Sequence, residues 1–444
     1  MAQTTSSRVL VQRSPLPLEV LNRIFLLILP SDLELDEEWR LPFSQRLQGS
    51  GLLLCAVCAL WRTLALATPQ LWRQILIHIP QGISKAIACS KADNLLQQIQ
   101  RSTLPLALYI SSEGFFGQAR ARVPSIISVL QRHATRCRAL YLQNPSDNLL
   151  VEIFKSEQIV RSPLRRGVRT MPQENQLFSW AQLTHLQIRR CISPQHALVI
   201  FNACSKLAWL SINLKLPPRP AYVDDSEPPI ILHDLASIFL GSDTACLSLV
   251  MPLISAPSLR EMCVASTWTT TRDSQSLVHF LTRSSCTLDR LELGGNFVDY
   301  DIIPVLAHES SSSLTSLVIR DFPDQDRDFF PLVNDEILRR LTLHRDDSLC
   351  PHLNLLGLRG ITGSQSVVQS MIESRKFPQA DRLQHFHLQW DNVLEFDLKQ
   401  LDEVLERSEM AYSLDSDSRN SSASGWPQGE TYSQDIYCTG LRNW

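Results

Sequence analysis

Large apolar residues recur along most of the chain in one short pattern, Leu-x-x-Leu-x-Leu. Most neighbouring copies are separated by about 24 to 30 residues, a period typical of units that hold one strand and one helix. The clear copies are Leu183-Leu186-Ile188, Leu207-Leu210-Ile212, Leu259-Met262-Val264, Leu288-Leu291-Leu293, Leu314-Leu317-Ile319, Leu338-Leu341-Leu343, Leu353-Leu356-Leu358 and Leu383-Phe386-Leu388, with weaker ones at Cys137-Leu140-Leu142 and Thr244-Leu247-Leu249.

Segments with apolar residues at three- and four-residue spacing lie between these copies, as amphipathic helices require. They are residues 125–136, 195–205, 276–284, 302–308 and 366–374. The alternation predicts an α/β fold, an irregular leucine-rich-repeat solenoid of parallel strands and helices over residues 135–407. An ordinary α/β domain whose strands happen to read Leu-x-Leu is the alternative. The uneven steps, short after Leu338 and long after Leu207, predict loops or a degenerate copy.

The first apolar run, near residues 16–28, also has helical spacing. Pro17 suits the first helical position and Glu19 the first turn. Apolar residues cover one face and widen onto a second, so two sides of this helix need cover. These residues are Leu18, Val20, Leu21, Ile24, Phe25, Leu27 and Ile28.

A second apolar helix is predicted from Leu52 to about Leu66, ended by Thr68-Pro69. Val57, Cys58, Trp61 and Leu64 are expected to face a core, and Leu71-Trp72 to follow as a hydrophobic corner. Helices of this size bury too little surface to fold well alone. They need the rest of the chain or a partner, although ordinary helix packing would give the same spacing.

The series Leu16-Pro17-Leu18-Glu19-Val20-Leu21, Ile24-Phe25, Val57-Cys58, Trp61-Arg62 and Thr68-Pro69-Gln70-Leu71-Trp72 resembles the F-box, most of all that of fungal F-box proteins. The resemblance covers about residues 14–80. It implies docking to a Skp-type adaptor protein and, through it, to a cullin. The acidic connection at residues 30–51 is longer than the family usually has. The residues implied in adaptor binding are Leu16, Pro17, Leu18, Val20, Leu21, Ile24, Phe25, Val57 and Trp61.

Composition narrows the class of protein. A net charge of −3 argues against general nucleic-acid binding through a basic surface. No run is long and apolar enough to predict a membrane span, and the first residues do not predict a secretory signal. The 11 cysteines are scattered and mostly in apolar segments, which favours reduced thiols and a cytoplasmic or nuclear location.

The expected organisation has five parts. A disordered start (1–13) precedes the F-box-like helices (14–80), a connecting helical segment (81–134), the solenoid (135–407) and a Ser-rich disordered tail (408–444). Exposed loops are expected at residues 155–179, which are rich in arginine, and at 217–229, which are rich in proline.

Sequence motifs that would indicate a metal site, a redox site or a phosphate-binding site are weak. Cys55-x-x-Cys58 has metal or redox spacing but lies in an apolar helix with no second pair nearby. His385-x-His387 shares one face of a strand but lacks a third ligand. Leu293-Gly294-Gly295-Asn296 is too short for a phosphate loop. We therefore expect no catalytic residue, metal or cofactor, and rank an enzyme last among the functions considered.

In each predicted strand, the residues beside the central leucine point away from the core, onto the inner face of the solenoid. The later strands align Arg320, Arg340, His344, Arg359 and His385, so we predict a mildly basic patch for an acidic or phosphorylated peptide. A solvated polar face without a ligand is the alternative. The function expected from the resemblance is the substrate-recognition subunit of a Skp–cullin–F-box ubiquitin ligase, and a non-degradative interaction scaffold is the alternative. Other inner-face positions are His185, Gln187, Arg189, Trp209, Ser211, Asn213, Arg290, Glu292, Ser316, Val318, Thr342, Gly357, His387 and Gln389.

Overall fold

The fold is described from a computed structural model of the 444-residue chain. The structure describes residues 16–27, 50–80, 83–112, 124–145, 147–154, 180–216, 228–242, 246–266, 271–295, 299–320, 333–343, 348–361, 363–375, 383–391, 401, 404–406 and 411–417. The start at 1–13, the loops at 155–179 and 217–227, and most of the 30–51 connection lie outside these residues.

A 12-stranded sheet forms the body of the molecule, and every neighbouring pair of its strands is parallel. The strands follow one another in chain order, and a two-stranded sheet of Ile230–Ile231 (β6) and Ile254–Ser255 (β8) is separate. The main strands are β1 Gln74–Ile79, β2 Leu106–Ser112, β3 Cys137–Gln143, β4 His185–Ile192, β5 Trp209–Leu214, β7 Ser237–Ser242, β9 Glu261–Ser266, β10 Arg290–Gly295, β11 Ser316–Arg320, β12 Leu355–Ile361, β13 His385–Asp391 and β14 Ala411–Asp417.

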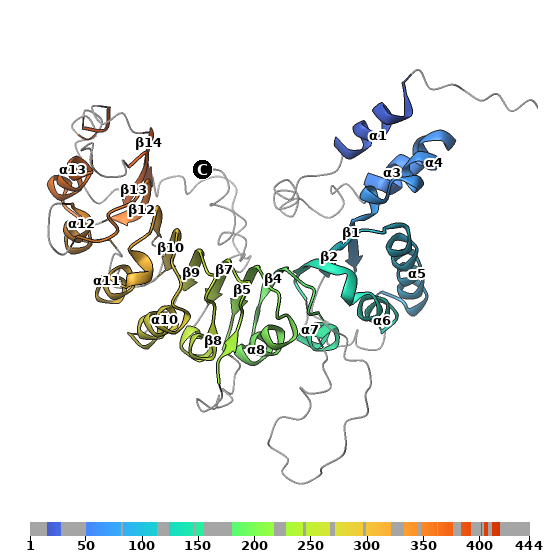
Figure 1. The fold of residues 1–444 in the computed structure, drawn as a ribbon, viewed down its shortest axis with the longest axis horizontal. Helices are drawn as coiled ribbons and strands as arrows, with labels where there is room; N and C mark the ends of the chain where they lie inside the picture. The colour runs from blue at the N-terminus through green and yellow to red at the C-terminus, as the bar shows by residue number, and fades with distance from the viewer. Residues whose placement is uncertain are drawn as a thin grey trace, which may run out of the picture.

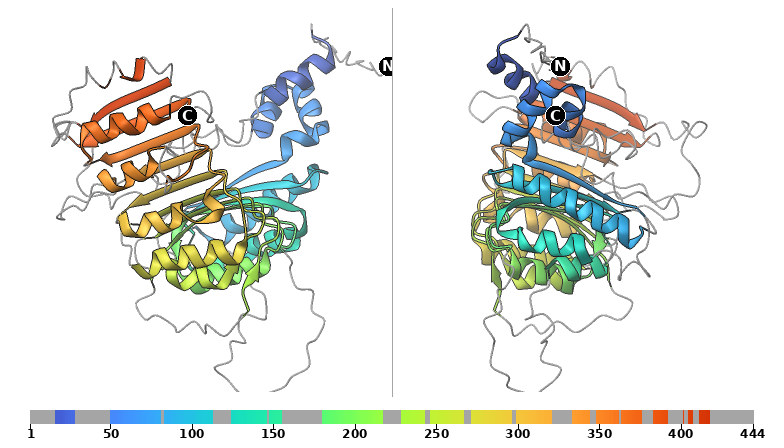
Figure 2. Two further views of the ribbon diagram at one scale, coloured as in Figure 1. Left: turned by 60° about the vertical axis from the view of Figure 1, so that its left-hand side comes forward. Right: turned by 90° about the vertical axis from the view of Figure 1, so that its right-hand side faces the viewer.

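The helices between the strands cover one face of the sheet, and the whole curves into an arc with the strands on its inner side (Figure 1). The same layering appears when the molecule is turned (Figure 2). This arrangement confirms the predicted alternation of strand and helix. The helices are α5 Lys85–Arg101, α6 Pro124–Arg132, α7 Asp147–Phe154, α8 Pro194–Ala203, α9 Leu247–Val250, α10 Thr271–Ser284, α11 Asp299–Leu306, α12 Asp335–Leu341 and α13 Gln365–Ser374, with 3₁₀ turns η4 Ala134–Arg136, η6 Met251–Leu253 and η7 Glu309–Ser311.

The core lies between the sheet and the helices and is continuous along the array. The central leucine of each repeat meets its counterpart on the next strand, as where Leu291 lies between Met262 and Leu317. All three are at most 2% exposed. Each unit therefore buries its apolar face against its neighbours, as expected for a solenoid.

Three arginines, of which Arg375 is buried and the other two are partly buried, join consecutive units on the helical side. Arg136, Arg283 and Arg375 each lie near the end of one helix and donate hydrogen bonds to main-chain carbonyl groups of the preceding unit. Most of these carbonyls lie at or just beyond helix ends, where they have no partner within the helix, and that of Cys350 lies in the loop before β12.

Two predicted copies of the repeat are wrong, and one copy was missed. Leu338 and Leu341 lie in helix α12, not in a strand. The weak copy at Leu247 falls in helix α9. The strand between β5 and β9 is β7, whose buried Ile238 and Leu240 follow Leu235 at the repeat spacing. Its central residue is isoleucine, as that of other copies is methionine or phenylalanine, so the pattern was present but overlooked.

The sheet also extends beyond its predicted limits. It begins at β1, inside the segment assigned to the F-box, and β2 lies in the segment predicted as a connector. At the other end β14 pairs with β13 although its residues were assigned to a disordered tail. In β14 Tyr412 and Leu414 are in register with the buried Phe386 and Leu388, so the apolar alternation continues despite the surrounding serines and aspartates.

The N-terminal helices stand at one end of the arc, next to β1 (Figures 1 and 2). We call them, with the turn that follows, the N-terminal module. The predicted second helix is two helices, because the chain breaks at Cys58, which caps the second one through its sulfur atom. The module consists of α1 Leu18–Leu27, α3 Ser50–Val57, α4 Ala59–Ala67 and η2 Pro69–Trp72.

Candidate functional site

The N-terminal module has a small hydrophobic core of its own, separate from the core of the array. Phe25 is fully buried in it, and its ring meets that of Trp61 edge to face, with centroids 5.0 Å apart. Leu54, Ala65 and the η2 residues complete this core. So few buried residues provide little stabilisation, and the module depends on what it packs against.

Polar contacts fix the order of the helices in the module. Thr68 donates to Asn22 of α1 at 3.2 Å and to the Leu64 carbonyl at 2.8 Å. Arg62 of α4 donates to the carbonyl of Cys55 in α3 at 2.8 Å. These contacts hold α1 and α3 against α4, so the two predicted helical segments do form one unit.

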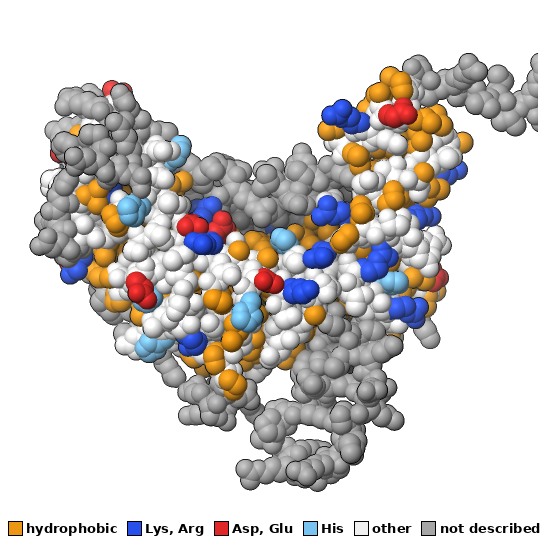
Figure 3. Space-filling view, in the orientation of Figure 1, with side chains coloured by type: hydrophobic (Ala, Val, Ile, Leu, Met, Phe, Trp, Pro, Cys, Tyr) orange, Lys and Arg blue, Asp and Glu red, His pale blue; other side chains and the backbone are white. Residues whose placement is uncertain are grey.

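Exposed apolar side chains cover the outside of this module (Figure 3, upper right). Among the described residues, Ile87 and Ile231 are the exposed large hydrophobic side chains that lie outside it. Such a concentration of apolar side chains on one part of a protein surface is typical of an interaction site. The members within the helices are Leu18, Val20, Leu26, Leu27, Leu52, Leu53, Val57 and Leu66, and Leu16 lies just before α1.

The predicted adaptor-binding residues divide into two groups. Leu21 and Phe25 are buried, and Ile24 and Trp61 are partly buried, so these four belong to the module's interior. Val57, expected to face a core, is instead 60% exposed. It joins Leu16, Pro17, Leu18 and Val20 at the surface. Five further exposed leucines were not among the predicted adaptor-binding residues, although the paired Leu26-Leu27 and Leu52-Leu53 exceed what one buried helix face can hold.

Trp72 links the module to the array. Its ring is buried in the module core, and its indole N–H donates to the Ala65 carbonyl at 2.9 Å. The guanidinium of Arg101, at the end of α5, lies over the same ring at 4.7 Å from its centroid. A cation over a tryptophan face is favourable, so the contact ties α5 to the module.

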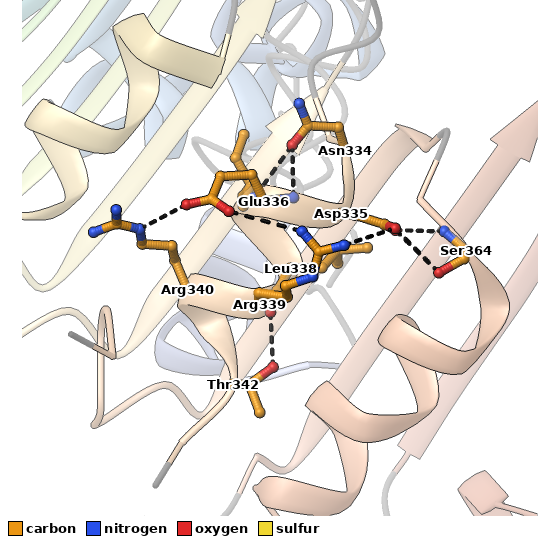
Figure 4. A network of polar contacts seen from close by, with 9 residues as sticks. Asn334, Asp335, Glu336, Leu338, Arg339, Arg340, Thr342 and Ser364 are labelled. Carbon is orange, nitrogen blue, oxygen red and sulfur yellow. Dashed lines mark hydrogen bonds and ion pairs between the residues drawn. The ribbon is translucent and has the colours of Figure 1, made fainter. Parts of the chain in front are cut away.

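Of the residues predicted to form a basic patch on the inner face, Arg320 and Arg340 are paired with carboxylates, and Arg340 is not on a strand. Arg320 does lie on β11, but its guanidinium pairs with Glu292 at 3.2 Å. Arg340 lies on helix α12, where it pairs with Glu336 at 3.0 Å (Figure 4). His385 is exposed at the start of β13, whereas His344 and the side chain of Arg359 lie outside the described residues.

Two groups of aromatic side chains lie on the first half of the inner face. Tyr109 and Tyr141 stack in parallel, with centroids 4.4 Å apart. Farther along, Trp209 lies between His185 and Phe239, at 6.4 and 5.5 Å. Sequence inspection placed Trp209 on this face but missed Phe239, because β7 was not recognised.

Carboxylates follow the aromatic rings along the face. Glu261 on β9 is half-buried and accepts a hydrogen bond from Ser237 at 3.0 Å. Glu292 on β10 is 4% exposed, and burial raises the pKa of its carboxyl group although Arg320 and Arg290 oppose the shift. Its Oε1 contacts Arg320, whereas its Oε2 is shielded and accepts no hydrogen bond.

Within the part of the chain that the structure describes, no three His, Cys, Asp or Glu side chains are grouped to hold a metal ion. Cys55 and Cys58 are both free. No helix in the described ranges has the length and apolar character to cross a membrane.

Comparison with known proteins gives no family. No family model matches the chain, and no curated protein matches it. Among 16 matching chains of solved structures is a protein from Bacteroides fragilis, with 14% sequence identity and a TM-score of 0.36. The match covers 66% of this chain and 71% of that one. At this TM-score the likeness supports no functional conclusion.

Proposed function

We propose that this protein is the substrate-recognition subunit of a Skp–cullin–F-box ubiquitin ligase. The N-terminal module would dock on the Skp-type adaptor, and the inner face of the array would hold a target protein. The observation that carries the proposal is the exposed apolar surface of the module, in the segment that resembles an F-box. Nine of the eleven exposed large hydrophobic side chains among the described residues lie in or next to this module, and a partner that covers them would release water from them.

The proposal assigns no bond chemistry to this chain. A recognition subunit raises the effective concentration of a target lysine near an enzyme bound elsewhere in the complex. The Trp72–Arg101 contact supports this role, because a fixed junction between module and array would keep that distance constant.

The test is adaptor binding by the full chain with substitutions at exposed positions. Leu18→Asp and Val57→Asp place charges where the adaptor would lie, and both sites are open enough to leave the fold intact. We expect adaptor affinity to fall by at least about 30-fold, the effect of losing one interface hot spot.

Ile87→Asp is the matched control, because Ile87 is 52% exposed on α5 outside the module. It should leave adaptor binding unchanged. Failure of the unmodified protein to bind a Skp-type adaptor, or equal loss with Ile87→Asp, would refute the docking assignment. Buried Phe25 is unsuitable for this test, since its removal would unfold the module.

The second candidate is an interaction scaffold that binds the adaptor without causing degradation. Both functions need the same docking surface, so binding does not separate them. The cellular abundance of proteins captured by the array does: it should rise with Leu18→Asp if they are ligase substrates and stay constant if the protein is a scaffold.

A further inference from the structure

We propose that the inner face between β5 and β10 binds an extended target segment through a lysine or arginine side chain, which lies against Trp209 and Phe239 and beside the carboxylates of Glu261 and Glu292. This inference deepens the proposed function, on which it rests for the assignment of the inner face to a target. It reverses the acidic target expected from the sequence.

The strand register brings the four side chains together. Trp209, Ser237 and Glu261 occupy one row across three neighbouring strands. Phe239, Cys263 and Glu292 occupy the next row. Neighbouring strands are about 4.8 Å apart, so each aromatic residue is one or two strands from a carboxylate. A single long side chain spans such a distance.

The aromatic half of the site offers ring surfaces. Trp209 and Phe239 are half-buried, and their rings are tilted at 46° with centroids 5.5 Å apart. An ammonium or guanidinium group is attracted to the face of a tryptophan or phenylalanine ring. Tryptophan on an open sheet face is also typical of the centre of an interface.

The acidic half has unused capacity for a cation. Among the described residues, the carboxylate of Glu261 accepts a hydrogen bond from Ser237 and forms no ion pair. Glu292 is held inside the sheet surface with one oxygen lacking any donor. A buried carboxylate without its full set of hydrogen bonds costs stability, and such costs concentrate at functional sites.

The nearby cations do not fill this role. Arg320 is committed to Oε1 of Glu292. Arg290 on β10 is the register partner of Glu261 on β9, and it already has an interaction of its own. An incoming lysine or arginine would therefore be the group that completes the two carboxylates, while its aliphatic stem covers the rings.

The test is selection of random displayed peptides on the full-length protein, followed by affinity measurement of the enriched sequences. We expect enriched peptides to carry lysine or arginine, and replacement of that residue by methionine to weaken binding about 10-fold. Glu261→Gln should cause a similar loss without altering the fold, because the amide keeps the size of the carboxylate. Trp209→Ala should weaken binding by about 3- to 30-fold.

Glu373→Gln, at an exposed carboxylate on the outer helix α13, is the matched control and should leave peptide affinity unchanged. Enrichment of acidic or phosphate-bearing peptides, binding that survives Glu261→Gln, or no enrichment at all would overturn the inference. Adaptor binding is measured on the same variants. If adaptor binding fails while basic peptides bind at this site, the ligase assignment falls and the cation site stands.

Discussion

The guanidinium of Arg375 donates two hydrogen bonds to the carbonyl oxygen of Leu341, from Nε at 2.9 Å and from Nη2 at 2.6 Å. It also reaches the carbonyls of Leu349 and Cys350, each at 3.1 Å. Leu341 ends helix α12, so one side chain provides donors for carbonyls that the helix leaves unpaired. Burial lowers the pKa of Arg375 to about 10, and the group remains charged at neutral pH.

Replacing Arg375 with methionine should therefore destabilise the array. The variant keeps a long apolar stem but leaves buried carbonyls without donors, which we expect to lower the free energy of unfolding by about 3 kcal/mol. Urea denaturation followed by circular dichroism measures the change. Arg339→Met is the control, since Arg339 makes partly exposed ion pairs that contribute little. Equal urea midpoints for the two variants would show that the hydrogen bonds of Arg375 do not stabilise the array.

Gly295 has a positive φ of 114°, and a Cβ placed there would lie 1.7 Å from the carbonyl oxygen of Ser266. Gly295→Ala should therefore force β10 away from β9 and destabilise the fold by about 1–3 kcal/mol or more. Gly357→Ala is the comparison, because its Cβ would meet only Val318 methyl groups at 3.4 Å. Thermal melts of the two variants check this, and a smaller loss for Gly295→Ala would contradict the close approach.

The repeat predicted most of the strands correctly, because the Leu-x-Leu part of the pattern is typical of a strand whose alternate residues are buried. It failed at Leu338, Leu341 and Leu343, because leucines three residues apart also fit one face of a helix. The helix signals were present in the sequence. Asn334 caps α12, Asp335 and Glu336 occupy its first turn, and Arg339 and Arg340 its last turn.

Removing the Phe25 ring should unfold the N-terminal module while the array stays folded. Phe→Ala substitutions in cores cost about 3–5 kcal/mol, more than a core this small is expected to withstand. Limited proteolysis with peptide mapping should show faster cleavage at residues 50–67 in Phe25→Ala. Leu18→Ala, at an exposed position, should leave the cleavage pattern unchanged. Protection of the module in Phe25→Ala would show that it does not depend on this ring.

The thiols should differ sharply in reactivity. Burial raises the pKa of the Cys137 and Cys204 thiols, and that of Cys350 to about 12, so these side chains are neither ionised nor accessible at pH 8. Cys58 and Cys89 are exposed and should react first with iodoacetamide among the cysteines that the structure describes. Mass spectrometry of the labelled protein identifies the order. Early labelling of Cys137 in folded protein would contradict the described core.

Adaptor binding gives a further readout from the same experiment. Cys58 lies beside Val57 in the module, whereas Cys89 lies on α5. If the adaptor covers the exposed apolar surface, it should slow labelling of Cys58 and leave Cys89 unaffected. Equal rates at Cys58 with and without a bound adaptor would place the contact elsewhere.

Glu292 should make stability depend on pH. Its folded-state pKa is raised, so the folded protein binds more protons than the unfolded chain at pH values between the ordinary value of 4.5 and the raised value. Its contribution to the free energy of unfolding is therefore present below about pH 4.5 and is lost as the pH rises through the folded-state pKa. Glu292→Gln should remove this component, as urea midpoints compared across that range would show. Parallel pH profiles for the two proteins would contradict the burial of an ionisable carboxyl.

The inner-face site was harder to predict than the sheet. The sequence assigned Arg320 to a basic patch, but in the structure its charge is paired with Glu292. In the register Arg320 lies opposite Gly294, two residues along β10 from Glu292, so this ion pair is a diagonal one. Phe239 was missed because its strand, β7, was not recognised, and Glu261 was missed although the repeat at Leu259-Met262-Val264 placed its strand correctly. Local sequence patterns indicate which residues point away from the core. The net charge of the surface that they form depends on ion pairs between strands that are distant in sequence.

The position of the N-terminal module has a consequence for biosynthesis. The ribosome releases the module before most of the array has been made, at about 5–20 residues per second. Its exposed leucines therefore meet solvent while the later units are still absent, and during that interval they are a hazard for aggregation. A partner or chaperone that binds this surface during translation would shorten that interval, and the yield of soluble protein should depend on its supply.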